Sequence, residues 1–178
     1  MKKYVTGFIV LLFIFLAANT DGISTPARSM KEAKRLVFFC NYKSALPYLQ
    51  QVYRSDTSNA YFNYLLGYCM YNIPSEKQNS IPYLQRATRT VAPVIKEWSV
   101  KEVKAPEKAW LYYAMALQYS YRFSQAVPAY KEYGKICPGA EKKMVDHYIY
   151  CCESGMELLK DSIEITIDNL GEILNGIL

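Results

Sequence analysis

Residues 109–138 read AWLYYAMALQYSYRFSQAVPAYKEYGKICP, and this stretch predicts two short helices folded against each other. In its first half, four apolar side chains recur at i, i+3, i+4 and i+7, which places them on one stripe of a helix: Trp110, Tyr113, Ala114 and Leu117. After a short polar connection at 120–124, a comparable stripe follows, formed by Ala126, Tyr130, Tyr133 and Ile136. Because Ala114 and Ala126 are small, the two backbones can approach closely, and Pro138 ends the second helix.

This pattern resembles the tetratricopeptide repeat, a helix-turn-helix unit of about 34 residues with aromatic and small residues at set places and a Pro at its end. Two earlier stretches repeat it more weakly. The second helices of the three units carry related motifs, which are SALPYLQ at 44–50, NSIPYLQ at 79–85 and QAVPAYK at 125–131. Pro47, Pro82 and Pro128 share one place in this motif, and we assign them to the first turn of each second helix, where a missing N–H costs little. The sequence therefore predicts an all-α fold, a right-handed superhelix of three helical hairpins.

The three units differ in length. The second unit begins at Ala60, and we expect its two helices to approach most closely at Leu66 and Gly67. The step from Pro82 to Pro128 is 46 residues, which leaves about a dozen extra residues within 90–104. We interpret these extra residues as an extension of the second helix or as a small additional helix.

The chain beyond Gly139 predicts a closing helix and then a strand. Residues 140–160 place four side chains on one helical side, as expected of a helix that caps a repeat stack: Met144, Tyr148, Cys151 and Cys152. Ile163, Ile165 and Ile167 then alternate with polar residues, which is typical of a short strand.

The N-terminus has the pattern of a secretory signal peptide. Lys2 and Lys3 precede a nearly unbroken apolar run at 5–18, and small residues follow it. The run is shorter than the roughly 18 to 20 apolar residues of a spanning helix. We predict a signal peptide over 1–20, cleaved after Ala18 or Thr20, a repeat domain over 21–160, and a strand and tail over 161–178. An uncleaved anchor is the alternative. We expect the protein to be exported.

Three repeats, the closing helix YIYCCESGMELLKD and the segment IEITIDNLGEILN are together similar to the amino-terminal part of a family of exported Bacteroidetes proteins. Members carry tetratricopeptide repeats, a β-propeller and an OmpA-like domain that binds peptidoglycan. Their closing helix carries a Cys and runs into a strand that ends in Asn-Leu-Gly, matched here by Cys151 or Cys152 and by 169–171. Within the repeats, 63–87 is the best match.

Some members look like accessory components of the type IX secretion and gliding machinery. The resemblance therefore implies a place in the periplasm, at the outer membrane. After Gly171 the sequence has only EILNGIL, so the propeller and the OmpA-like domain are missing and peptidoglycan binding is not expected.

A stripe of tyrosines is the candidate binding surface. Tyr61, Tyr64, Tyr68 and Tyr71 recur at i, i+3, i+7 and i+10, and the largely opposed face carries Phe62, Leu65, Leu66 and Cys69. If the second set holds the core, the tyrosines face the concave groove, where their rings and hydroxyls suit peptide capture. We expect Met115, Gln118 and Tyr119 to line the same groove. The alternative is that two or three of the tyrosine rings pack between neighbouring helices.

Other functions have less support. The formal charge of +5 falls to +3 without Lys2 and Lys3, which is too weak to indicate nucleic acid. His147 is the only His and no nucleophile accompanies it in a motif, so we predict no catalytic residue, no metal site and no cofactor. The five Cys are odd in number and lack C-x-x-C spacing, which favours buried free thiols over a disulfide.

The sequence therefore favours a non-enzymatic scaffold or adaptor that binds a polypeptide partner in the cell envelope. The alternative is a small exported enzyme or glycan-binding protein built on helical repeats.

Overall fold

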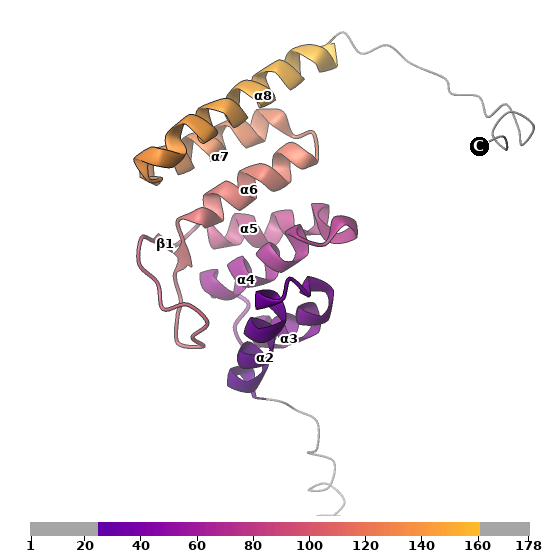
Figure 1. Cartoon of the computed structure of the whole chain (residues 1–178), viewed down its shortest axis with the longest axis vertical. Coiled ribbons are helices and arrows are strands. Elements are labelled where there is room, and N and C mark those ends of the chain that lie inside the picture. Colours follow the sequence, from indigo (N-terminus) through magenta and orange to yellow (C-terminus); the bar gives the residue numbers. More distant parts are fainter. Residues whose placement is uncertain (1–24, 161–178) are drawn as a thin grey trace, which may run out of the picture.

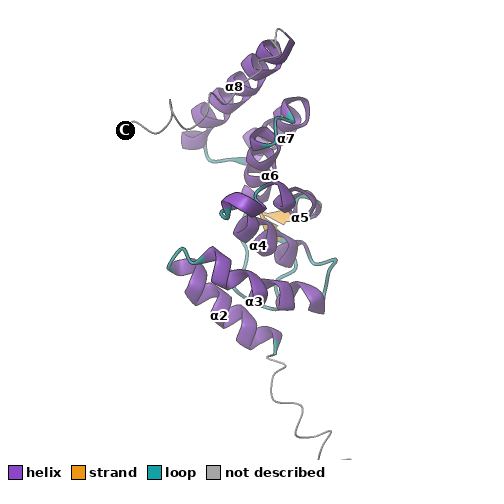
Figure 2. Ribbon diagram, turned by 90° about the vertical axis from the view of Figure 1, so that its right-hand side faces the viewer, coloured by secondary structure: helices purple, strands orange, loops and turns teal. Residues whose placement is uncertain are grey.

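The structure, a computed structural model, describes residues 25–160 and is all-α. Three helical hairpins follow one another and a long helix closes the stack (Figure 1), as predicted. The hairpins are α2 (Pro26–Phe38) with α3 (Tyr42–Ser55), α4 (Ala60–Tyr71) with α5 (Ile81–Ala87), and α6 (Lys108–Tyr119) with α7 (Phe123–Ile136); the closing helix is α8 (Lys142–Lys160). Each helix packs on the next, which gives the elongated stack seen in Figure 2.

The predicted leader at 1–20 and the predicted strand and tail at 161–178 lie outside the described residues. Among the helices of residues 25–160, none combines the length and the apolar composition needed to span a bilayer.

The first and third hairpins share the same turn. Cys40 and Tyr121 both adopt a left-handed backbone with φ of 56°. Directly after them, the N–H of Asn41 donates to the carbonyl of Leu36 and the N–H of Arg122 donates to the carbonyl of Leu117, both at 2.9 Å. These are the bonds of a Schellman motif, which ends a helix and satisfies its last carbonyls. The shared turn supports the interpretation of the two hairpins as copies of one unit.

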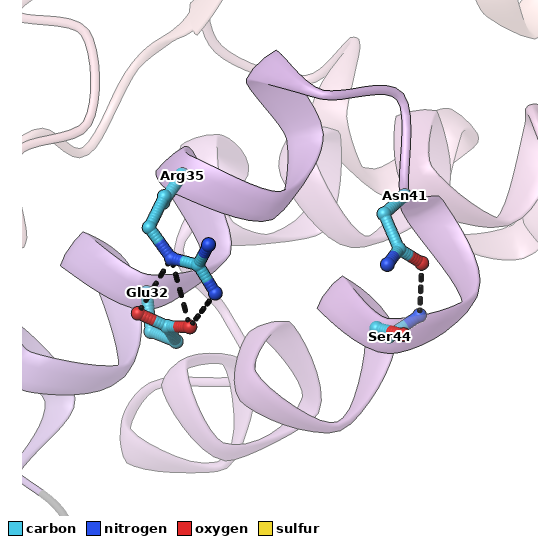
Figure 3. A network of polar contacts seen from close by, with 4 residues as sticks. All are labelled: Glu32, Arg35, Asn41 and Ser44. Atoms are coloured by element: carbon cyan, nitrogen blue, oxygen red, sulfur yellow. Dashed lines mark hydrogen bonds and ion pairs between the residues drawn. The ribbon is translucent and has the colours of Figure 1, made fainter.

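The predicted place of the prolines is confirmed for one of the three. Pro82 is the second residue of α5, but Pro47 and Pro128 lie inside α3 and α7, past the first turn. In the first hairpin the start is set by Asn41, whose Oδ1 accepts the N–H of Ser44 at 3.3 Å (Figure 3). In the second unit, a 3₁₀ turn at Gln78–Ser80 stands where the other units have their first α-helical turn, and another at Pro74–Glu76 precedes it.

Figure 3 also shows an ion pair on the preceding helix. Arg35 Nη2 lies 2.6 Å from Glu32 Oε1, one turn apart on α2, and both side chains are partly exposed. Such a surface pair contributes little to stability, so packing must hold the hairpins together.

The core is divided along the stack. One buried cluster joins α2, α3 and α4, and a second joins α5, α6, α7 and α8. Between them lies a small cluster built only of alanines, which are Ala60, Ala87, Ala105 and Ala109. Tyr64 packs against all three clusters, so its ring ties the two halves of the stack together.

Small residues permit the close helix contacts that the sequence predicts. Ala114 and Ala126 are fully buried between α6 and α7. A Cβ atom on Gly67 would lie 2.7 Å from Leu84 Cγ, so only glycine lets α4 approach α5 this closely.

For two residues, Ile136 and Cys151, the prediction of a buried position is wrong. Ile136, the last residue of α7, is 37% exposed. Cys151 is only half-buried, whereas Val145 and Cys152 are the buried residues of α8. Adjacent residues on a helix point about 100° apart, so Cys152 faces α7 and Cys151 does not.

The extra residues between α5 and α6 form no helix, contrary to the prediction. Val91–Ala92 (β1) pairs in parallel with Ala105–Pro106 (β2), which holds the two ends of the insertion together. Residues 93–104 between these strands, the crossing loop, fold back on α4 (Figure 1). Asn59 Nδ2 donates to the carbonyl of Glu102 at 3.0 Å, and the N–H of Trp98 donates to the hydroxyl of Tyr61 at 2.5 Å.

The carboxylate of Glu102 explains why the crossing loop is not helical. It accepts the backbone N–H groups of Lys96, Val103 and Lys104 at 2.7, 2.9 and 2.9 Å. These donors are then unavailable to a helical ladder, and Trp98 adopts a left-handed φ of 58°.

Candidate functional site

The α4 helix is buried on the side that the sequence predicts. Phe62, Leu65, Leu66 and Cys69 are each less than 5% exposed and form part of the core. The four tyrosines occupy the other side, but they do not share one environment. Two of them are built into the structure and two remain half-exposed.

Tyr61 and Tyr64 are the structural pair. Tyr61 is 1% exposed, so the expectation that it faces an open groove is wrong, because the crossing loop covers it and bonds to its hydroxyl. Tyr64 is largely enclosed by the three core clusters. The alternative interpretation, rings packed between elements, therefore holds for these two tyrosines.

Tyr68 and Tyr71 are half-buried and meet a ring from the next hairpin. The ring of Tyr112, on α6, lies 4.9 Å from that of Tyr68, 5.6 Å from that of Tyr71 and 6.3 Å from that of Tyr64. Edge-to-face contacts of this kind fix the rings relative to one another. We call Tyr64, Tyr68, Tyr71 and Tyr112 the tyrosine face.

Tyr112 is not among the groove residues predicted from the sequence. The sequence does contain a pattern that predicts its place. Tyr112, Met115 and Tyr119 recur at i, i+3 and i+7 and so share one side of α6. The stripe used to predict the hairpin began instead at Trp110 and Tyr113, which lie on another side of that helix.

A pocket of about 240 Å³ opens at one end of the tyrosine face. Its walls come from α2, α4, the crossing loop and the start of α6, and it brings together residues far apart in sequence. The lining residues are Val37, Tyr61, Tyr64, Leu65, Tyr68, Ile95, Glu97, Trp98, Pro106 and Lys108. This volume is below the range of about 300–1,000 Å³ typical of small-molecule sites, so it suits one large side chain better than a cofactor.

A cation stands at the other end of the tyrosine face. The ammonium of Lys77 lies 4.9 Å from the ring centre of Tyr71 and 4.5 Å from that of Tyr119. Both distances are within cation–π range, so Lys77 links α6 to the turn that follows α4. The structure thus brings Tyr119, predicted for the groove and 48% exposed, next to Tyr71.

The remaining two residues that were predicted to line the groove contact the interior of the protein instead. Met115 packs against the second core cluster and is half-buried. Gln118 Oε1 accepts a hydrogen bond from the hydroxyl of Tyr130 at 2.6 Å, so its side chain is turned toward α7.

Three rings of the tyrosine face, those of Tyr64, Tyr71 and Tyr112, stay neutral at physiological pH because they are buried. Burial raises the pKa of Tyr112 to about 12, and burial likewise raises the pKa values of Tyr64 and Tyr71. Both signs of charge lie near the face, since Glu97 and Lys108 line the pocket and Lys77 lies over Tyr71, while residues 25–160 as a whole hold 19 Lys and Arg against 11 Asp and Glu, a formal charge of +8. The face can therefore offer apolar rings, hydroxyl groups and nearby cations.

Nothing in this part of the chain assembles reactive groups. His147 lies on the outside of α8 with its Nε2 3.5 Å from Cys151 Sγ. In residues 25–160, no three His, Cys, Asp or Glu side chains are placed to hold a metal ion. All five cysteines are free; Cys69 and Cys152 are buried as predicted, whereas Cys40 is exposed.

Burial also makes the two inner thiols poor nucleophiles, because it raises the pKa of Cys69 to about 12 and that of Cys152 to about 11.

The fold and this surface define a helical-repeat protein with an aromatic face shared by the first helices of two hairpins. No protein-family model matches the chain, and no curated protein matches it.

Proposed function

We propose that this protein is a non-enzymatic scaffold or adaptor that holds a polypeptide partner on the tyrosine face. The observation that carries the proposal is the pocket beside Tyr68, which is open, aromatic and large enough for one bulky side chain. Half-exposed Tyr68, Tyr71 and Tyr119 continue from it along α4 and α6. An extended segment could place an anchor side chain in the pocket and lay its backbone along these hydroxyls.

The charges favour an acidic segment. Lys108 lines the pocket together with Glu97, Lys77 stands at the far end of the tyrosine face, and the described body carries +8. A partner segment with an aromatic or large aliphatic anchor flanked by Asp or Glu would match both features. The signal-peptide pattern and the family resemblance support a partner in the cell envelope, and we propose a periplasmic location at the outer membrane.

Site-specific crosslinking tests the proposal. A photoreactive amino acid replaces Lys108, which is exposed at the pocket, or Lys131, which is exposed on α7, in the cells that produce the protein. We expect one polypeptide to be captured from Lys108 and not from Lys131. Mass spectrometry of the crosslink then identifies the partner segment, which is synthesised and titrated against the purified protein.

The titration uses Tyr68→Ala as the test variant and Tyr150→Ala as its control. Tyr68 lines the pocket, whereas Tyr150 is 66% exposed on α8. We expect Tyr68→Ala to weaken binding about tenfold or more, as for an aromatic hot spot, and Tyr150→Ala to leave it unchanged. Tyr64 is unsuitable for this test because its ring supports all three core clusters. Equal affinity of the two variants, or capture from Lys131 alone, would refute the proposal.

A further inference from the structure

The second helix of the middle hairpin is unusually short. α5 has 7 residues, whereas its counterparts α3 and α7 have 14 each. It stops at Ala87 because the chain leaves there for the insertion that contains the crossing loop. Where a full-length helix would lie beside α7, the side of α6 that carries Trp110 and Tyr113 is left partly uncovered.

A pocket of about 570 Å³ occupies this gap. It is lined by α5, by Thr88 directly after α5, and by α6 and α7, and it shares no residue with the pocket beside Tyr68. Trp110 lies two residues before Tyr112 on α6, which turns it about 200° away around the helix. The two pockets therefore lie on different sides of the molecule.

The lining combines an aromatic surface with neutral polar groups. Trp110 and Tyr113 are both half-buried, with ring centres 6.4 Å apart. Around them stand two amides, two hydroxyls and a carboxylate, from Gln85, Gln125, Thr88, Ser124 and Glu132. None of the lining residues is Lys, Arg or His, although the described body as a whole is strongly basic.

We infer that this pocket binds a neutral pyranose oligosaccharide. The C–H face of a pyranose ring packs on an indole, while its hydroxyl groups exchange hydrogen bonds with amides, hydroxyls and a carboxylate. The lining offers no cation to a phosphate or carboxylate ligand, and its one charged residue, Glu132, already pairs with Lys135 at 2.5 Å outside the lining. A polypeptide helix would require a more apolar groove. The volume lies within the range of about 300–1,000 Å³ found for small-ligand sites.

Titration of the purified protein with cellotetraose, maltotetraose and chitotetraose tests the inference. Fluorescence is read in a Trp98→Phe background, which leaves Trp110 as the only tryptophan and keeps the backbone N–H that bonds to Tyr61. We expect a saturable change with at least one of the three sugars and a Kd of about 0.01–1 mM, as suits a shallow, preformed site.

Gln85→Ala with Gln125→Ala is the test variant, because both side chains are exposed and their removal leaves the core intact. We expect it to weaken binding about tenfold or more, since two hydrogen bonds to the ligand are lost. Lys131→Ala, exposed on α7 outside the lining, is the control and should bind normally. Far-UV circular dichroism verifies that each variant is folded.

Four results would overturn the inference. The first is the absence of a saturable change with all three sugars, and the second is equal affinity of the double glutamine variant and the control. The third is a sugar response abolished by Tyr68→Ala, which would assign sugar binding to the tyrosine face. The fourth is competition by the crosslinked partner segment at this pocket, which would assign the pocket to polypeptide binding.

Discussion

At the scale of single residues, Gly67 sets the distance between α4 and α5. A Cβ atom there would lie 2.7 Å from Leu84 Cγ and 3.1 Å from the backbone nitrogen of Leu84. The side chain of Leu84 could rotate away from the added Cβ atom. The backbone of Leu84 could move away only if the whole of α5 moved. Gly67→Ala should therefore lower the free energy of unfolding by about 1–3 kcal/mol, as overpacked core substitutions do. Urea unfolding followed by circular dichroism measures this change.

Gly134 provides the matched control for this prediction. It also lies in a helix and faces a neighbouring one, but its added Cβ would lie 3.4 Å from Val145 Cγ1 and no backbone atom is as close. Gly134→Ala should therefore gain the helix propensity of alanine and raise the free energy of unfolding by about 0.5–1 kcal/mol. If the free energy of unfolding changed by the same sign and size in the two variants, the close approach of α4 to α5 would not be the reason for glycine at position 67.

At the scale of elements, the crossing loop determines how much of the tyrosine face is open. It covers Tyr61 and supplies Ile95, Glu97 and Trp98 to the neighbouring pocket. Three backbone N–H groups converge on Glu102, so this carboxylate is the centre of the loop.

Glu102→Ala should loosen the loop while the helices stay folded. Trypsin can cut after Lys96, Lys101 and Lys104, and we expect cleavage there to be about tenfold faster in the variant because the open form is more populated. Glu97→Ala removes a carboxylate of the same loop that accepts none of these three N–H groups, and it should leave the rate unchanged. Equal cleavage rates in the two variants would count against the role of Glu102.

The same element indicates a dependence on pH. The N–H of Lys96 makes the largest contribution to holding the pKa of Glu102 below its ordinary value of 4.5, and the N–H of Lys104 adds to it. A group with a lowered folded pKa stabilises the fold above its unfolded pKa and loses that effect as pH falls through the folded pKa. The crossing loop should therefore remain in place at neutral and mildly acidic pH.

The helices and the presence of the insertion could be predicted from the sequence, whereas the path of the insertion could not. The 3.6-residue period and the repeated Pro motif mark each hairpin, because every helix must bury one stripe. In the insertion, side-chain acceptors and two-residue strands decide the path, and these depend on contacts with Asn59 and Tyr61 far earlier in the chain. Periodicity carries no signal of such long-range bonds.

At the scale of the whole molecule, the stack explains why only part of the binding surface was predicted. Sequence spacing places Tyr61, Tyr64, Tyr68 and Tyr71 on one side of α4. Which of them stays accessible depends on what the next hairpin and the crossing loop cover, and Tyr112 joins them only because α6 packs against α4. A pattern within one helix cannot contain that information.

The stack also buries tyrosines along its whole length, and this predicts a sharp loss of stability in alkali. Burial raises the pKa of Tyr61 and of Tyr112 to about 12 from an ordinary value of 10, and it raises those of Tyr64, Tyr130 and Tyr133 as well. Above pH 10 the unfolded chain loses these protons while the folded chain keeps them. The raised pKa values of these tyrosines thus make their full contribution to the free energy of unfolding below pH 10. That contribution is lost as pH rises through the folded pKa values.

We therefore expect the free energy of unfolding, measured in urea from neutral pH to about pH 12, to fall by at most about 1.4 kcal/mol per pH unit for each buried tyrosine. A variant with Tyr61→Phe and Tyr112→Phe cannot release these two protons, so its alkaline slope should be smaller, while lysines and thiols contribute equally to both proteins. An identical slope in the two proteins would show that these rings are open to solvent. It would also contradict the position of the crossing loop over Tyr61.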